Sequence, residues 1–217
     1  MRAVILAACT FLLAPVSFAY QEFYPSGLGM TWHYAGHMKQ DNAAKIRVEA
    51  KIISFDTINS VQYMYYAAPS VDVRFMVRVD EAGAYMKLVK YPFPILKFLT
   101  VDVYMEPEIQ FLKFPLTEGE TWTQNLKATA DLVPFKLNRD VKVKFTVVAK
   151  EKFRYKGADL DCYRVRMERD EGMGTLWVED NWFASGLGFV RGDTPEYFIE
   201  LNGYDPVSAM PSSATAK

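Results

Sequence analysis

The sequence has little of the side-chain chemistry from which catalytic and metal sites are usually built. Its 217 residues include only two histidines and two cysteines, and one cysteine, Cys9, lies in the apolar stretch at the N-terminus. The remaining Cys162 has no partner for an internal disulfide, so the stability of the fold must come from packing. Cys162 also sits in a segment of alternating polarity, which favours an inert core thiol over a nucleophile.

The two histidines are badly spaced for a shared metal ion. The residues around His33 and His37 favour a strand, on which both side chains would point to the same side. They would then sit roughly 13 Å apart, which is too far for one ion. We therefore expect no metal and no cofactor.

Two further patterns lack the context that chemistry would require. Gly186 and Gly188 would have to open a helix to cradle a phosphate, and no helical pattern follows them, so a tight turn or bulge is expected. Glu179 and Asp180 are adjacent and would face opposite ways on a strand, so they cannot act as a carboxylate pair. The sequence therefore does not predict an enzyme.

Neither sign of charge dominates, and only one long apolar run is present. The chain has 25 basic and 26 acidic residues, whereas a nucleic-acid partner would call for a concentrated basic surface. No nucleic acid is expected as a partner. The long apolar run is confined to residues 1–19, so no membrane-spanning segment is expected once it is removed.

This N-terminal stretch has the features of a secretory signal peptide. Arg2 supplies a positive charge, residues 3–13 are apolar, and a small-x-Ala pattern ends at Ala19, which predicts cleavage after that residue. An alternative is a lipoprotein cleavage box at residues 6–9 that would place a lipid on Cys9. It is the weaker reading, because too few residues precede the cysteine. The protein is expected to be periplasmic or secreted.

Helical patterns are scarce, and the chain shows alternation with a period of two instead. No stretch sustains an apolar stripe at helical spacing between a cap and a stop. Apolar and polar residues alternate repeatedly, with turn-forming clusters between the runs. The alternating runs cover 45–55, 71–79, 141–153 and 163–168, and the turn clusters cover 56–60, 80–83, 155–159 and 170–174.

A series of strands joined by short turns is the pattern of a meander. We expect a single all-β domain over residues 20–204, formed by one long curved antiparallel sheet. The sheet should curve as a half-barrel whose apolar face closes on itself. Residues 205–217 lose the alternation and become rich in Ser, Ala and Pro, so a disordered tail is predicted.

One motif occurs twice. YPSGLGMTW at 24–32 is matched by FPLTEGETW at 114–122, which places the two tryptophans 90 residues apart. In each copy proline would restrict the chain, glycine would make a turn and Thr-Trp would begin a strand. The motif predicts two related halves, 20–90 and 114–204, unless all strand-turn-strand sequences simply look alike. The further matches are 45–50 with 142–147 and 75–80 with 163–168.

Residues 91–113, between these halves, break the alternation. The segment carries three prolines among many large apolar residues, so it is too apolar for a solvated loop. We expect a lid or linker over the open side of the sheet; the alternative is a pair of ordinary strands with proline ends. The residues expected to contact an apolar ligand are Phe93, Ile95, Leu96, Phe98, Leu99, Ile109 and Phe111.

The second half resembles a known bacterial family. FPLTEGETW at 114–122, YKGADLDCYRVR at 155–166, NWFASGLGFVRG at 181–192 and IELNGY at 199–204 occur in that order. Together they resemble the envelope family catalogued as domain of unknown function 3108. The resemblance covers mainly 114–204, and Ser185 stands where that family usually has proline. It implies a fold similar to the periplasmic lipoprotein-localisation carriers, with an apolar hollow and no established activity.

Composition points to binding rather than catalysis. Aromatic residues make up 15% of the chain, and there are ten methionines; both side-chain types suit the walls of an apolar site. The leading hypothesis is an exported envelope protein that binds a lipid, an acyl chain or another apolar molecule in the concave face of the sheet. The alternative is a structural envelope protein that docks on a protein partner through residues 91–113.

Overall fold

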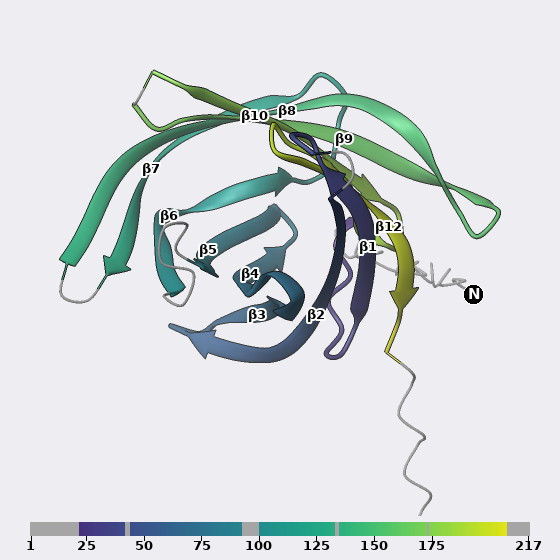
Figure 1. Cartoon of the computed structure of the whole chain (residues 1–217), viewed down its shortest axis with the longest axis horizontal. Coiled ribbons are helices and arrows are strands. Elements are labelled where there is room, and N and C mark those ends of the chain that lie inside the picture. Colours follow the sequence, from purple (N-terminus) through teal and green to yellow (C-terminus); the bar gives the residue numbers. More distant parts are fainter. Residues whose placement is uncertain (1–21, 42–43, 93–99, 133–134, 173, 208–217) are drawn as a thin grey trace, which may run out of the picture.

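The computed structural model describes residues 22–41, 44–92, 100–132, 135–172 and 174–207. These residues form antiparallel strands and one short 3-10 helix, η1 (Pro69–Val71). Each strand pairs with its neighbour along the chain, as a meander requires (Figure 1). The strands are β1 (Thr31–Met38), β2 (Lys45–Ile58), β3 (Val61–Ala68), β4 (Val73–Asp80), β5 (Gly83–Pro92), β6 (Thr100–Lys113), β7 (Thr121–Leu132), β8 (Phe135–Tyr155), β9 (Ala158–Asp170), β10 (Leu176–Ala184), β11 (Gly188–Asp193) and β12 (Tyr197–Asp205).

The meander closes on itself, which corrects the expected half-barrel. β1 pairs with β2 on one side and with β12 on the other, so the twelve described strands form a closed barrel. Closure gives the first and last strands of the chain a hydrogen-bonding partner that an open sheet would leave to solvent. The prediction of an all-β antiparallel meander is confirmed, whereas the open side is not found among the described residues.

The strands differ greatly in length. β8 has 21 residues, and its hairpins with β7 and β9 extend beyond the ring on opposite sides (Figure 1). The turn clusters predicted from composition lie between consecutive strands, which confirms them. At the tip of the β8–β9 hairpin, for example, Lys156 and Gly157 adopt positive φ angles of 47° and 87°.

The central segment also differs from its predicted role. Residues 100–113 form β6, a strand of the barrel wall that pairs with β5 and β7, so this part of the segment is no lid over an open side. The alternative, a pair of ordinary strands with proline ends, describes it better, because Pro92 ends β5 opposite Thr100 of β6. Residues 93–99 lie outside the described residues.

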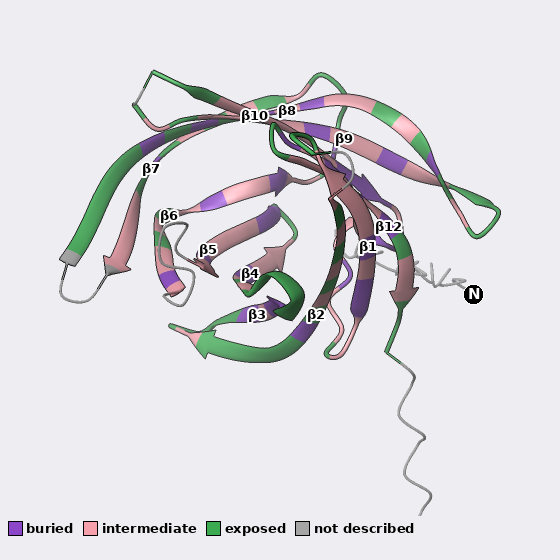
Figure 2. Ribbon diagram, in the orientation of Figure 1, coloured by how far each residue is buried: buried purple, intermediate pink, exposed green. Residues whose placement is uncertain are grey.

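Figure 2 marks the buried residues in purple, and nearly all of the buried residues are apolar. One cluster is built mainly on β1–β4 and β10–β12, and a second mainly on β5–β9. The same partly buried residues pack against both, so the two clusters form one continuous core. These shared residues are Tyr24, Val79, Met86, Phe111 and Phe189.

The repeated motif forms the same turn in both places. Thr31 begins β1 and Thr121 begins β7, each immediately after a turn. The glycine two residues earlier has a positive φ in both copies, 85° at Gly29 and 83° at Gly119. The predicted roles of glycine in the turn and of Thr-Trp as the start of a strand are therefore confirmed, whereas the role of proline stays a prediction.

The two turns also share their backbone hydrogen bonds. The Gly29 N–H donates to Ile52 O (2.9 Å), and the Ile52 N–H donates to the carbonyl that follows the glycine (3.1 Å). Gly119 and Val147 repeat both bonds, at 2.8 and 2.9 Å. A register shift follows Ile52 in β2 and Val147 in β8. This shared geometry supports internal duplication, which stays a prediction.

One of the echoes further along the chain does not match in position. Residues 75–80 lie in β4, the fourth strand, whereas 163–168 lie in β9, the third strand counted from β7. The similarity between these two runs reflects the common alternation of strands rather than equivalent places.

The turn glycines allow a direct test of backbone strain. A Cβ atom at Gly29 or Gly119 would meet no atom within 4 Å, so the cost of alanine comes from the positive φ alone. We expect Gly29→Ala and Gly119→Ala each to lower the free energy of unfolding by about 1 kcal/mol, measured by urea denaturation. Leu28→Ala, at an exposed neighbouring side chain, is the control and should change it by less than about 0.5 kcal/mol. Equal effects at Leu28 and Gly29 would contradict this account.

Candidate functional site

The segment before β1 lies against the interior of the barrel. The Tyr24 ring contacts Tyr66 of β3 and Phe111 of β6 edge-on, with centroids 5.9 and 5.6 Å apart. Phe23 makes a similar contact with Tyr163 of β9 at 5.3 Å. Burial raises the pKa of Tyr24, so its phenol stays neutral and part of the core. The first copy of the motif therefore helps to fill the barrel as well as opening β1.

Two of the seven predicted ligand-contacting residues lie in this core. Ile109 is buried in the second cluster, and Phe111 packs at the junction of the two clusters, 6.4 Å from the Phe183 ring. In this structure both side chains contact other side chains of the protein. Phe93, Ile95, Leu96, Phe98 and Leu99 lie outside the described residues, so the ligand-contact prediction stays untested for all seven.

A row of apolar side chains crosses six adjacent strands on the inner face. Its members are paired directly with one another from β3 to β8, so their side chains stand side by side. Exposure rises along the row, from 8% at Tyr66 to 57% at Leu137, and the side chains between them are half-buried. The apolar row consists of Tyr66, Phe75, Val89, Val103, Ala130 and Leu137.

The apolar row faces the interior. Ala128, two residues before Ala130 on β7, and Met105, two residues after Val103 on β6, both pack against the second core cluster. Residues two apart on a strand share a face, so Val103 and Ala130 face the same way. The row therefore leads from solvent at Leu137 to the core at Tyr66.

The backbone pairing between β6 and β7 is interrupted. These strands pair only from Asp102–Asp131 to Glu106–Lys127, although β6 continues to Lys113. Pro107 follows directly and has no N–H to donate to β7, so the ladder stops there. We call this unpaired stretch, residues 107–113 of β6 beside 121–126 of β7, the seam.

Two side chains of β7 bridge the seam near its middle. The Gln110 N–H donates to Gln124 Oε1 (2.9 Å), and Trp122 Nε1 donates to the Gln110 carbonyl oxygen (2.8 Å). Side chains of β7 thus satisfy the backbone groups of β6 that a strand ladder would otherwise use. The seam therefore lacks backbone pairing, is bridged at Gln110, and ends at the ion pair of Lys113 with Glu120 (2.6 Å).

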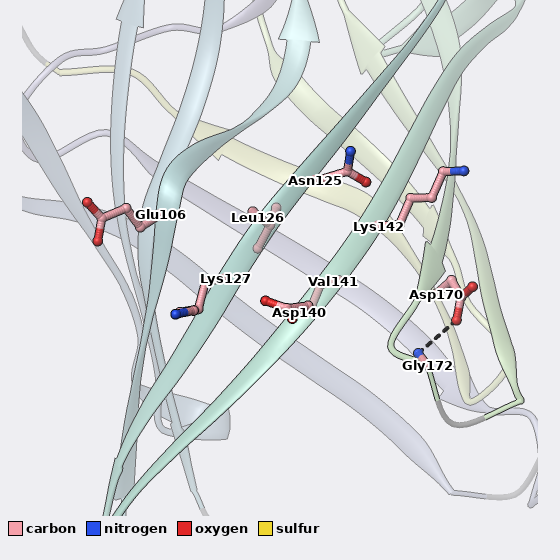
Figure 3. A pocket seen from close by; sticks show the side chains of 9 residues that line it. All are labelled: Glu106, Asn125, Leu126, Lys127, Asp140, Val141, Lys142, Asp170 and Gly172. Atoms are coloured by element: carbon pink, nitrogen blue, oxygen red, sulfur yellow. Dashed lines mark hydrogen bonds between the residues drawn. The ribbon is translucent and has the colours of Figure 1, made fainter.

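A hollow of about 440 Å³ lies beside the start of the seam (Figure 3). Leu126 and Val141, which line it, belong to the buried core, whereas the other side chains of the lining are polar or charged. The volume falls within the range of small-molecule sites. The lining consists of Glu106, Asn125, Leu126, Lys127, Asp140, Val141, Lys142, Asp170 and Gly172.

Four charged side chains that line this hollow have no ion-pair partner within the described ranges. Within the described ranges, Glu106, Lys127, Asp140 and Lys142 form no ion pair, although Lys127 faces Asp140 across the β7–β8 ladder. Elsewhere cross-strand partners do pair, as Arg166 and Asp180 do through bonds of 2.9 and 3.0 Å. The hollow therefore offers charges of both signs to a ligand.

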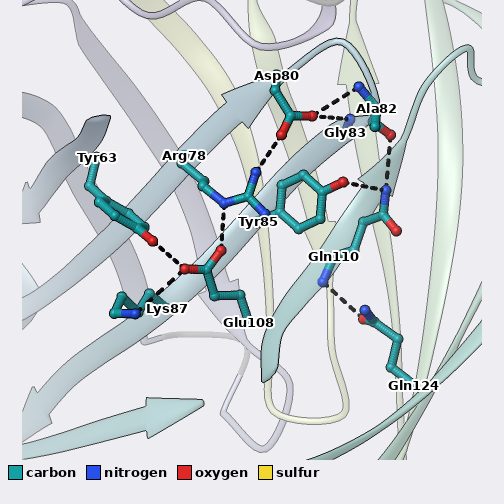
Figure 4. Close-up of polar contacts among 10 residues, drawn as sticks. All are labelled: Tyr63, Arg78, Asp80, Ala82, Gly83, Tyr85, Lys87, Glu108, Gln110 and Gln124. Carbon is teal, nitrogen blue, oxygen red and sulfur yellow. Dashed lines mark hydrogen bonds and ion pairs between the residues drawn. The ribbon is translucent and has the colours of Figure 1, made fainter. Parts of the chain in front are cut away.

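The other side of β6 is held by a polar network centred on Glu108 (Figure 4). Its carboxylate accepts hydrogen bonds from Tyr63 of β3 and Arg78 of β4, and Lys87 of β5 lies 3.6 Å away. Burial alone would raise the pKa of Glu108, but these hydrogen bonds and positive charges outweigh it and lower the pKa. Burial and the neighbouring Glu108 raise the pKa of Tyr63 to about 12. The network ties residue 108 to β3–β5 rather than to β7.

His33 and Cys162, which the sequence does not favour as metal-binding or catalytic residues, lie in ordinary structural surroundings. His33 lies 2.9 Å from an Asp205 oxygen and 3.6 Å from a Glu49 oxygen. Cys162 is buried and free, and burial raises the pKa of its thiol to about 12. In the described part of the chain, no three His, Cys, Asp or Glu side chains group as metal ligands. No helix within the described ranges is long and apolar enough to cross a membrane.

The adjacent acidic residues and the Gly-x-Gly run also take structural roles. Glu179 accepts hydrogen bonds from Trp177 and Asn181, while Asp180 pairs with Arg166. Residues 185–187 form the predicted tight turn between β10 and β11, with positive φ at Gly186 and Gly188.

Comparison with known proteins supports the fold class. No family model and no curated protein matches the chain, so the resemblance to domain of unknown function 3108 stays an expectation. A candidate lipoprotein from Parabacteroides distasonis ATCC 8503 has a similar crystal structure, with a TM-score of 0.51 and 13% identity over 84% of this chain and 98% of that chain. The hypothetical lipoprotein YmcC from Escherichia coli (K12) scores 0.46 at 9% identity, over 84% and 90% of the two chains, which is too weak to support a conclusion.

Sequence reasoning missed the apolar row and the seam. Val103 and Ala130 are ordinary strand residues, and only the strand register shows that they are neighbours. Pro107 was the available signal for the seam, because a proline inside a strand marks a position where pairing ends. The sequence-based interpretation instead assigns Pro107 to the predicted lid or linker.

The Glu108 network predicts a pH-dependent contribution to stability. Glu108→Gln should lower the free energy of unfolding by about 1–3 kcal/mol near neutral pH, because a charged hydrogen-bond acceptor is lost. The folded-state pKa is lowered, so the contribution is present above the unfolded pKa of about 4.3 and is lost as pH falls through the folded value. Chemical denaturation at several pH values should show the two proteins converging in acid.

Glu106→Gln provides a matched control two residues away on the same strand. Glu106 is exposed and makes no ion pair with the described residues, so this change should be nearly neutral at every pH. A constant difference between the wild type and Glu108→Gln down to strongly acidic pH would contradict the assignment.

Proposed function

We propose that this protein is an exported envelope β-barrel that binds the apolar chain of an amphipathic molecule, such as a lipid or the acyl chain of a lipoprotein. The apolar row carries the proposal. It offers half-buried apolar side chains in continuous order from solvent to the core, a surface that an acyl chain would desolvate. The hollow beside the seam, which carries charges of both signs, would face the polar part of the same molecule.

The dimensions of the row suit an acyl chain. Six adjacent strands spaced about 4.8 Å apart give a length of roughly 24 Å along the wall. One leaflet supplies about half of the 30 Å hydrocarbon core of a bilayer, so a long acyl chain fits within that length. The row includes Phe75, and Met105 flanks it on the inner face; aromatic and methionine side chains adapt well to apolar ligands.

The competing proposal is docking on a protein partner through the central apolar segment. Its apolar residues from 93 to 99 lie outside the described residues, and the described part of the segment is a wall strand. The ligand-binding proposal is argued from the described apolar row, whose members are direct cross-strand neighbours on the inner face.

Filling the row should block binding. Ala130→Trp places a large side chain on the inner face, and we expect it to weaken binding of cis-parinaric acid at least tenfold in a fluorescence titration. Thr129→Trp adds the same bulk one residue away on the opposite face and should leave the affinity unchanged. Equal affinity of the two variants would contradict the use of the row, and absence of binding to the wild type would contradict the function.

Mass spectrometry of organic extracts gives an independent test on the purified protein. We expect a co-purified lipid from the wild type and a reduced amount from Ala130→Trp. Clean extracts from the wild type, together with a failed titration, would favour docking on a protein instead.

A further inference from the structure

We infer that the hollow beside the seam is the binding site for the charged head of the amphipathic ligand, and that its apolar chain reaches the barrel interior between β6 and β7. This inference rests on the proposed function and adds a route of access and a class of head group. The proposed route passes through the wall of the barrel between two strands, away from the exposed end of the apolar row at Leu137.

The interrupted ladder is the first observation. Between the last paired residue of β6, Glu106, and the bridge at Gln110, no backbone pairing to β7 is present in these described strands. Separating two paired strands requires breaking several backbone hydrogen bonds, whereas this stretch is crossed by only two hydrogen bonds, made by Trp122 and Gln124, besides the apolar packing of Ile109 and Leu126. The seam is the part of the β6–β7 contact that opens at least cost.

The lining of the hollow is the second observation. By strand alternation, Asn125 and Lys127 lie on one face of β7 and Leu126 lies on the other, among the core residues. The hollow is therefore lined by residues of both faces, at the place where β6 leaves β7 (Figure 3). A chain that enters here meets the buried side chains of Leu126 and Val141 first.

The third observation is that each strand beside the seam is firmly bonded to its neighbours on the other side. The Glu108 network and the Gln110 bonds to Tyr85 and Ala82 anchor this half of β6 to the β3–β5 side (Figure 4). β7 pairs with β8 along its whole length. Each side of the seam thus belongs to a firmly bonded unit, and the two units can part without unfolding either.

The free charges indicate the class of head group. Lys127 and Lys142 would attract an anion such as a phosphate. Glu106, Asp140 and Asp170, whose carboxylate also accepts the Gly172 N–H, would repel a purely anionic head and attract an ammonium group. A zwitterionic head, with a phosphate and an ammonium group, satisfies both sets. Because these side chains are exposed, each pair contributes modestly, and their combined effect gives selectivity more than affinity.

The route predicts slower entry of the ligand, and loss of the head-group site predicts weaker binding. Asn125→Trp should fill the hollow, slow association of cis-parinaric acid about tenfold in stopped-flow fluorescence and raise its dissociation constant. Thr123→Trp is the matched control, on the same strand and face but outside the lining. Gln124→Ala removes the acceptor for the Gln110 N–H and should speed exchange.

The outcomes separate this inference from the proposed function. Binding with equal rates in Asn125→Trp and Thr123→Trp would overturn the route while leaving the function intact. Absence of probe binding to the wild type would instead remove the function itself.

Competition between single-chain lipids of equal chain length tests the head group. Lysophosphatidylethanolamine should displace cis-parinaric acid at about tenfold lower concentration than anionic lysophosphatidylglycerol. The double variant Glu106→Gln/Asp140→Asn should remove that preference. Equal displacement by the two lipids in the wild type would overturn the zwitterionic assignment.

Discussion

The pairing of β1 with both β2 and β12 is the constraint on which the rest of the structure depends. Backbone N–H and C=O groups need partners, and a long meander that ended in open edges would leave two rows of them exposed. Closing the ring satisfies them and encloses the two apolar clusters as one core. It also fixes which side chains face inward on all twelve strands.

The closed ring contains an interruption between β6 and β7. Pro107 ends the ladder, and the chain compensates with side chains rather than backbone, through Trp122 and Gln124. The carboxylate of Glu108 is drawn to the opposite side by Arg78 and Lys87. The barrel wall thus lacks backbone pairing at this place, next to a hollow whose charged side chains include several without an ion pair. The proposed access route follows from this gap in the backbone pairing between β6 and β7.

Local patterns in the sequence were enough for the strands and turns but not for their assembly. Alternation located β2, β4, β8 and β9, because a strand with one buried face must repeat every two residues. Gly29 and Gly119 marked their turns, since a positive φ favours glycine. Ile109 and Phe111 were predicted to line a ligand site, and the structure places both among core side chains, where neighbours from distant strands surround them. Residues such as Val103 and Ala130 carry no special local signal at all.

The sequence by itself determined the β class, the antiparallel meander and the two equivalent turns. Each of these depends on neighbours within a few positions along the chain. Only the tertiary structure decided that the sheet closes, that residues 100–113 form part of its wall, and that the apolar row and the free charges lie where they do. Those features depend on strand register and on pairing between residues far apart in the chain, such as Thr31 with Asp205, which alternation alone does not specify.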